Sequence, residues 1–290
     1  MIFPMRTFRP RFAFLLVLLS APAYAAELPE GFVYLRDVDA SIAQDMRYAG
    51  SDNFTGRPLP GYGAAECVLR RAVAEALKRV QADLARQNLS LKVYDCYRPT
   101  RAVRAMAQWA NDGARAAPTK RFFPALEKRN LFALGYIAAQ SAHSTGAAVD
   151  LTLIPLRASP TVRSRASGNP GQQTQALPTA SGSPLEPVLG PAEGRTRVRG
   201  RTENQIAPCT APADKRAPDN SLDMGTGFDC FDVLSHTANG AVTGEQKRAR
   251  ATLGAAMRAH GFRNYFREWW HFSYGGGGPQ YDFPINPQAK

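Results

Sequence analysis

The spacing of apolar residues predicts two amphipathic helices in the first half of the chain and a third near its end. Over residues 66–87 apolar side chains recur every three or four positions, as on one face of a helix, and Asn88 marks its end. A second helix is predicted over 100–109, with the threonine at its start as N-cap. The capping-box spacing of 243–246 predicts a third helix that ends near Gly261.

Three segments have the composition of strands. Residues 91–97 are rich in β-branched and aromatic side chains. Residues 149–154 alternate, with Asp150 and Thr152 on one face, which predicts a half-buried strand whose polar face is available to a site. The aromatic-rich segment 262–274 is predicted as one further strand. Interleaved helices and strands, with strands that can pair through turns, predict an α+β fold.

The composition changes sharply after this second strand. Residues 155–221 are rich in Pro, Ser, Gly, Thr and Arg and contain few large apolar side chains. Such a stretch cannot bury enough surface to offset the entropy of ordering it. We therefore expect a long, largely mobile insert that divides the domain in sequence but not in space.

The N-terminal segment has the pattern of a secretory signal. Three arginines precede a short apolar run over 12–19, and a small-x-small sequence ends at Ala25. The run is shorter than the roughly 20 residues that a membrane-spanning helix needs, so no stable membrane anchor is expected. We expect residues 1–25 to be a cleaved signal peptide, and residues 26–290 to form an exported, periplasmic domain.

The formal net charge of +12 at first suggests an anionic partner. Much of the excess, however, lies in the N-terminal segment and in the insert, so the charge is weak evidence about partners of the folded domain. No nucleic-acid partner is predicted, and the basic insert is a candidate for contact with the cell wall.

The four cysteines are expected to form disulfides, because an exported protein meets an oxidising compartment. Four cysteines allow three connectivities. Their arrangement along the chain favours Cys67 with Cys96 and Cys209 with Cys230. A thiolate zinc site is the alternative, but no CxxC spacing supports it.

Two short stretches carry the candidate chemistry. His143 and Asp150 stand seven positions apart, and Glu268 stands three before His271. Two imidazoles and a carboxylate can hold zinc with a position left for water, and a nearby glutamate can relay the proton of that water. In a regular strand the last two residues would face opposite sides, so a bulge is expected there. Alternatively, all four groups are buried polar residues with structural partners.

Four other polar residues also have a functional and a structural interpretation. Arg98 ends a predicted strand and could stabilise an oxyanion, or it could be a surface arginine paired with Asp95. Asp229 could bind a substrate ammonium group, or it could be a solvated turn carboxylate. His236 and His260 are predicted to be structural.

The two stretches, over 141–153 and 268–271, resemble the zinc D-alanyl-D-alanine dipeptidases of the VanX type. Further matches lie, in the same order as in that family, at 48–56, 95–99, 224–229 and 235–240. The resemblance runs from about residue 34 to 283, apart from the insert. It implies a small antiparallel sheet with flanking helices that carries the metal.

The resemblance also implies roles for single residues. His143, Asp150 and His271 would be the ligands of one zinc ion per chain. Glu268 would be the general base, and Arg98 would stabilise the tetrahedral intermediate.

The implied substrate is the small dipeptide D-Ala-D-Ala. Asp229 and Tyr48 would bind its free amino end, and Ser141 would line the pocket. Because the vancomycin-resistance members act in the cytoplasm, a signal peptide favours turnover of cell-wall dipeptide over antibiotic resistance. The alternatives are a D,D-carboxypeptidase that trims wall peptides and a non-catalytic wall-binding module.

Overall fold

The computed structural model describes residues 27–113, 119–156 and 207–288. The predicted signal peptide and most of the predicted insert, residues 157–206, lie outside the described residues. None of the helices in the described ranges is long and apolar enough to cross a membrane.

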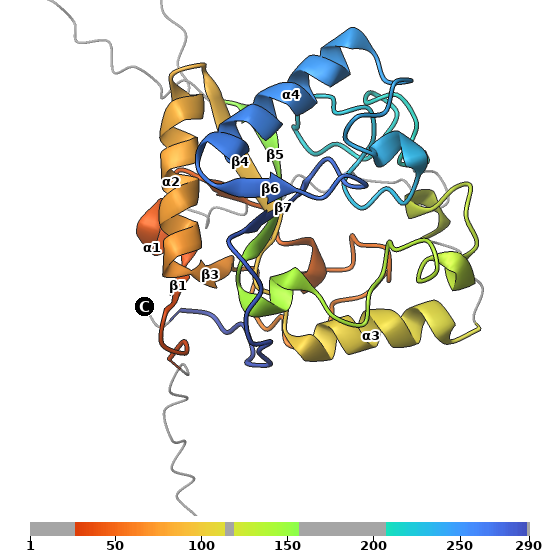
Figure 1. The fold of residues 1–290 in the computed structure, drawn as a ribbon. Helices are drawn as coiled ribbons and strands as arrows, with labels where there is room; N and C mark the ends of the chain where they lie inside the picture. Colours follow the sequence, from red (N-terminus) through yellow and green to blue (C-terminus); the bar gives the residue numbers. More distant parts are fainter. Residues whose placement is uncertain (1–26, 114–118, 157–206, 289–290) are drawn as a thin grey trace, which may run out of the picture.

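A five-stranded sheet forms the centre of the domain (Figure 1). In spatial order its strands are β2 (Ala43–Gln44), β4 (Leu89–Asp95), β5 (Ala148–Pro155), β7 (His271–Tyr274) and β6 (Phe262–Asn264). All neighbours are antiparallel except the short edge strand β2, which runs parallel to β4. The predicted α+β fold is confirmed, and the parallel edge strand is the one departure from an antiparallel sheet.

Two long helices cover one face of this sheet. They are α2 (Arg71–Ala85) and α4 (Gly244–Ala259), which also contact each other (Figure 1). The expected start of α2 at residue 66 was too early, because β3 (Val68–Arg70) pairs with β1 (Phe32–Tyr34) in a separate two-stranded sheet. The capping box at the start of α4 is confirmed.

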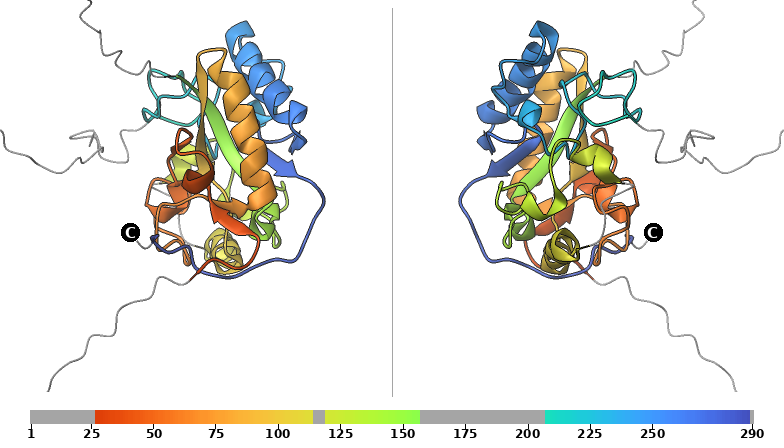
Figure 2. Two further views of the ribbon diagram at one scale, coloured as in Figure 1. Left: turned by 90° about the vertical axis from the view of Figure 1, so that its left-hand side faces the viewer. Right: turned by 90° about the vertical axis from the view of Figure 1, so that its right-hand side faces the viewer.

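The remaining helices are α1 (Leu35–Val38) and α3 (Thr100–Asn111). Figure 2 shows α3 at the opposite end of the molecule from α4. The predicted N-cap of α3 was wrong, because Thr100 is the first helical residue and Pro99 precedes it without a side-chain cap. Pro99 supplies the extended backbone from which the helix starts.

Two strand predictions need correction. The segment 262–274 is not one strand but an antiparallel pair, β6 and β7, joined by a turn that contains Glu268. Asn264 holds this turn, because its side-chain amide donates to the carbonyls of Glu268 and His271, both at 2.9 Å. Strand β5 is not half-buried: residues 148–153 are buried on both faces, by the helices on one side and by the site on the other.

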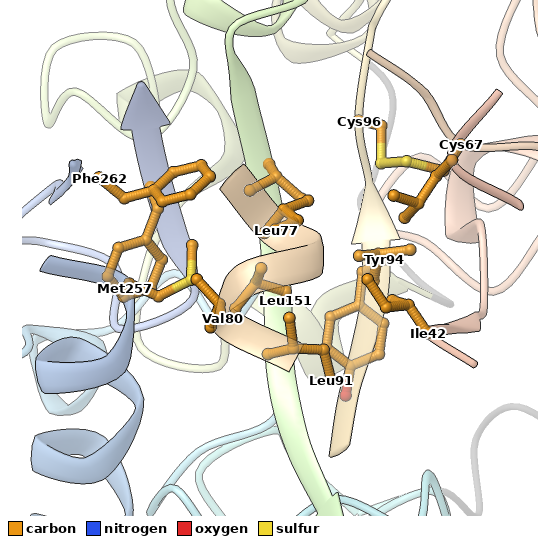
Figure 3. Packing of buried hydrophobic residues seen from close by; sticks show 14 of the residues in the cluster. Ile42, Cys67, Leu77, Val80, Leu91, Tyr94, Cys96, Leu151, Met257 and Phe262 are labelled. Atoms are coloured by element: carbon orange, nitrogen blue, oxygen red, sulfur yellow. A yellow bond between two sulfur atoms is a disulfide. The ribbon is translucent and has the colours of Figure 1, made fainter. Parts of the chain in front are cut away.

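The main core fills the space between the sheet and the helices α2 and α4. Figure 3 shows Leu77 and Val80 of α2 next to Leu151 of β5, with Met257 of α4 and Phe262 of β6 beside them. A second apolar cluster, which includes Tyr48, Phe54 and Trp109, packs around α3. The polar face of β5 lies between these two apolar clusters, whose packing holds it in place.

Both predicted disulfides are present, Cys67–Cys96 and Cys209–Cys230. The second one bears on the insert, whose last residues were expected to be mobile. Residues 207–221 instead pack on the domain. Asp219 accepts hydrogen bonds from the Lys92 ammonium through its carbonyl and from the Tyr94 hydroxyl, at 2.7 Å, through its carboxylate. These hydrogen bonds and the disulfide offset the entropy cost of ordering residues 207–221, which the few apolar side chains of the segment could not do alone.

Candidate metal centre and active site

A tight turn presents the first candidate ligand. His143 lies in the 3-10 turn η4 (Ala142–Thr145), and Ser141 caps the turn by accepting a hydrogen bond from the His143 backbone at 3.3 Å. Gly146 then turns the chain into β5 with a φ of +74°. A Cβ atom there would meet the Phe32 ring at 2.3 Å, so only glycine fits this position.

Strand register brings the other two ligands together. Asp150 of β5 is directly opposite His271, the first residue of β7. Residues opposite each other in an antiparallel pair point to the same face of the sheet. A register shift in β4 between Val93 and Asp95 also places Asp95 opposite Asp150. This bulge carries a second carboxylate to the same face.

The three ligand atoms converge. His143 Nε2 lies 3.1 Å from His271 Nδ1 and 3.3 Å from Asp150 Oδ1, and the last two atoms are 3.0 Å apart. Ligand atoms about 2.0–2.2 Å from one zinc in tetrahedral geometry would lie roughly 3.3–3.6 Å from one another. The trio therefore fits a single small divalent cation with little movement. Among the described residues, it is the group of histidine, cysteine and acidic side chains close enough to hold a metal ion.

The partners of the two imidazoles orient them. His143 Nδ1 lies 2.7 Å from the carbonyl oxygen of Cys96, which fixes the proton on Nδ1 and directs the Nε2 lone pair toward the other ligands. His271 has the opposite arrangement, with Nδ1 facing the trio and Nε2 3.4 Å from the Ser273 hydroxyl. Burial alone would raise the pKa of Asp150, but the two histidines hold it below its ordinary value. The carboxylate thus stays ionised and able to bind a cation.

Glu268 lies beside the trio, with Oε2 3.9 Å from His271 Nδ1. Because it is in the turn before β7 rather than within a strand, no bulge is needed for it to face the same side as His271. Burial, and then the charge of Asp150, raise the pKa of Glu268 to about 8. A partly buried carboxyl group with a pKa near neutrality is suited to take up and return a proton.

Arg98 is fixed in the site by a buried carboxylate. Its Nε and Nη2 donate to Asp95 Oδ2 at 2.9 and 2.8 Å, and Nη2 lies 3.6 Å from Asp150 Oδ2. The Tyr62 hydroxyl donates to the other Asp95 oxygen at 2.6 Å. Arg98 is therefore paired with Asp95, as the alternative interpretation held, but its side chain is only 12% exposed and not on the surface.

Asp229 and Tyr48 form a second polar pair in the site. The Tyr48 hydroxyl donates to Asp229 Oδ2 at 2.9 Å, and Asp229 is 4% exposed, which rules out a solvated turn carboxylate. Burial, and then the nearby charge of Asp150, raise the pKa of Asp229 well above its ordinary value. A cation that enters the pocket would favour the ionised form of this carboxyl group and would be stabilised by its charge.

One cavity of about 310 Å³ joins these groups. All eight predicted site residues line it: Tyr48, Arg98, Ser141, His143, Asp150, Asp229, Glu268 and His271. An apolar wall, to which Phe54, Met106 and Phe231 contribute, completes it. The roles of the eight predicted residues stay predictions, but the structure places all eight around one cavity.

Sequence reasoning missed the supporting residues. Asp95 was weighed only as a surface partner of Arg98, and neither Tyr62 nor the Cys96 carbonyl was considered. The Asp-Cys-Tyr-Arg spacing could have suggested Asp95, whereas nothing local pointed to Tyr62. His236 does not line the cavity, and His260 Nε2 is 2.8 Å from Asp83 Oδ2, away from it.

Comparison with known proteins extends this picture. A family model described as D-ala-D-ala dipeptidase matches residues 29–160 and 214–288, which include the three candidate ligands and leave out most of the predicted insert. The D-alanyl-D-alanine dipeptidase of Enterococcus faecium is 26% identical over 242 residues, 83% of this chain and 90% of that protein. That of Streptomyces coelicolor is 28% identical over 242 residues, with the same coverage. That of Escherichia coli is 25% identical over 228 residues, 79% of this chain and 76% of that protein.

The family match and the geometry agree on the kind of chemistry. The matched segments cover more than half of the chain, and they contain the converging histidines and aspartate as well as Glu268. This chain is accordingly a metallopeptidase that belongs to the D-ala-D-ala dipeptidase family.

Proposed function

We propose that the protein is a zinc-dependent dipeptidase that hydrolyses D-Ala-D-Ala. The observation that carries the proposal is that the buried Asp229 lines the same cavity as the cation trio and Glu268. The relatives that match most of this chain are named for this dipeptide. Two imidazoles and a carboxylate form a ligand set that suits zinc.

Each residue of the site has a separate role in the proposed reaction. A zinc ion held by His143, Asp150 and His271 would supply Lewis-acid activation of water and of the peptide carbonyl. Glu268 takes the proton from the attacking water and returns it to the leaving amine. Arg98, fixed by Asp95, stabilises the negative charge that develops on the carbonyl oxygen.

The position of Asp229 supports a dipeptidase over a D,D-carboxypeptidase. A free dipeptide carries an ammonium group that a buried carboxylate can bind, whereas a wall peptide has an uncharged amide at the same place. The same site argues against a non-catalytic wall-binding module, because such a module has no need of a base such as Glu268 beside the cation trio.

The proposed setting is the periplasm, where the enzyme would recycle dipeptide released from the cell wall. Two disulfides suit an oxidising compartment. The signal-like N-terminal pattern supports export, and the basic insert remains a candidate for contact with the wall.

The test is release of D-Ala from D-Ala-D-Ala and from its N-acetylated form by the zinc-loaded protein. We expect kcat/KM for the free dipeptide to exceed that for the blocked one by about 100-fold, because the blocked one leaves Asp229 without a cation. Asp229→Asn, which keeps the size of the side chain, should reduce this preference to near one. Equal or faster cleavage of the blocked form by the wild type would assign the carboxypeptidase activity instead. Cleavage of neither form would refute the proposed substrate.

Arg98→Lys should lower kcat by about 10- to 100-fold. A lysine ammonium keeps the charge, but it cannot donate to Asp95 through two nitrogens while it points into the cavity. Steady-state kinetics on D-Ala-D-Ala would measure the loss. Arg101→Lys is the matched control, because Arg101 pairs with Asp282 outside the cavity. Equal kcat in the two variants would remove Arg98 from the mechanism.

A further inference from the structure

We propose that the two disulfides position the active site and that each one serves a different half of it. Cys67–Cys96 holds the metal ligand His143, and Cys209–Cys230 holds the ammonium-binding residue Asp229. The second half of this inference rests on the proposed function, whereas the first half concerns metal binding alone.

One cysteine of the first disulfide, Cys96, supplies the backbone carbonyl that orients His143. The carbonyl oxygen of Cys96 lies 2.7 Å from His143 Nδ1, and both residues are almost completely buried. This contact decides which imidazole nitrogen carries the proton and where the other points. The backbone of Arg98 also donates to the His143 carbonyl at 3.3 Å. The position of the segment around Cys96 therefore sets the position of the ligand.

Strand β3 connects the other cysteine of this disulfide to the turn that carries His143. Cys67 directly precedes β3, whose last residue is Arg70. The Arg70 backbone donates to the Gly146 carbonyl at 3.0 Å, and its Nε donates to the Thr145 carbonyl at 2.8 Å. Strand β3 is thus hydrogen-bonded to the turn that carries His143 and covalently linked to the residue that orients it. Figure 3 shows this sulfur–sulfur bond at the end of β4.

The second disulfide is attached to the residue next to Asp229. Asp229 has a φ of +55°, in the left-handed region that is uncommon for non-glycine residues but more accessible to aspartate than to most of them. Cys230 follows Asp229, and the backbone of Gly227, two residues before Asp229, donates to the carbonyl of Cys209 at 2.9 Å. Cys209 thus holds the loop on both sides of Asp229.

The anchor of this disulfide is the 3-10 turn η2 (Thr119–Phe122). The Cys209 backbone donates to the Arg121 carbonyl at 2.8 Å, and the Phe231 backbone donates to the Phe122 carbonyl at 2.7 Å. The Asp229 side chain reaches Tyr48, and the Cys230 carbonyl accepts from Ser235 at 2.6 Å. Within the described ranges, no hydrogen bond of this loop goes to a metal ligand. The loop is linked to the residues before His271 indirectly, because the Ser235 carbonyl accepts from the Trp269 backbone at 3.1 Å. We therefore expect each disulfide to act mainly on its own half of the site.

The test compares two double variants by two readouts. C67S/C96S keeps the backbone carbonyl of residue 96 but frees its position, so zinc binding should weaken by up to about 10- to 100-fold, the effect of losing the orienting contact altogether. Competition with a chromogenic chelator would measure it. C209S/C230S should bind zinc within about twofold of the wild type but show a KM for D-Ala-D-Ala roughly tenfold higher at similar kcat, because a charge-assisted contact is weakened. Each variant is the control for the other.

Thermal unfolding of both variants separates positioning from general loss of stability. Leu84→Ala creates a cavity in the core beside α2, outside the site cavity, and should lower the melting temperature without changing zinc affinity or KM. If both disulfide variants changed the same parameter, or if L84A at an equal melting temperature reproduced either change, the proposal would be wrong. A wild type that binds zinc but leaves D-Ala-D-Ala intact would refute the proposed function only, because the zinc contrast is read without turnover.

A second route applies if a variant does not fold. In the folded wild type, dithiothreitol donates two electrons and two protons per bond and becomes a disulfide itself, and alkylation shows which cysteines have opened. Cys209 is 7% exposed while Cys67 and Cys96 are fully buried, so its bond should open first. KM should then rise before zinc affinity falls. The reverse order would overturn the assignment of the two bonds.

Discussion

Replacing Glu268 by glutamine should lower kcat on D-Ala-D-Ala by about 10³-fold and leave zinc bound. Glutamine has the same shape but cannot accept the proton of the attacking water, and general-base catalysis contributes about 10²–10⁴-fold. Glu268 lies 3.9 Å from His271 Nδ1 and is not one of the converging ligand atoms, so the cation trio is left complete. The measurements are single-turnover kinetics and metal content of the same preparation.

Two further variants sharpen this prediction. Glu268→Asp keeps the carboxylate but withdraws it by one methylene, and it should recover part of the activity. Glu268→Ala should be as inactive as the glutamine variant and should still bind zinc. Turnover that stays at the wild-type level in either the glutamine or the alanine variant would exclude Glu268 as the base.

His271→Ala should remove both the metal and the activity. His271 Nδ1 is within 3.1 Å of both other ligand atoms, and a catalytic zinc site with only two protein ligands left holds the ion poorly. We expect a fall in zinc affinity of at least about 10²-fold and a fall in kcat/KM of at least about 10³-fold at limiting zinc. Chelator competition and steady-state kinetics would measure these two effects.

His236→Ala is the matched control for this experiment. His236 is the same residue type and also follows a turn, but it lies outside the cavity and contacts the Phe266 ring. Its variant should keep zinc affinity and activity within about twofold. A similar loss in both histidine variants would point to a general effect on folding, and retention of zinc by His271→Ala would exclude it as a ligand.

The candidate ligands could be found from the sequence because the chemistry restricts the residue types so strongly. His143 lies just before the turn at Gly146, and Asp150 lies in the strand that follows this turn. The local pattern reveals both the turn and the strand, and Glu268 and His271 supply the remaining groups of a catalytic zinc site. What could not be predicted is the contact between them. The pairing of Asp150 with His271 depends on the register of β5 against β7, and more than a hundred residues separate these strands in the chain.

The supporting residues were harder to predict for a related reason. Asp95 reaches the site only because a bulge in β4 shifts its face, and an alternating pattern does not reveal a bulge. The segment 262–274 has the aromatic composition of a strand throughout, yet the side chain of Asn264 ends the first strand by bonding the turn. The composition of the insert similarly concealed that Asp219 finds buried partners on β4.

The place where the insert joins the domain explains how a metallopeptidase can tolerate it. Strand β5 carries Asp150 near its start and passes into the insert after Pro155, at the far end. The returning chain bonds back to the same strand, since the Leu222 backbone donates to the Leu153 carbonyl at 2.8 Å. The two ends are thus neighbours, and closing an eightfold longer loop between them costs only roughly 2 kcal/mol. Evolution can therefore lengthen, shorten or replace this loop as a nearly independent trait, while selection on catalysis acts at the other end of the strand.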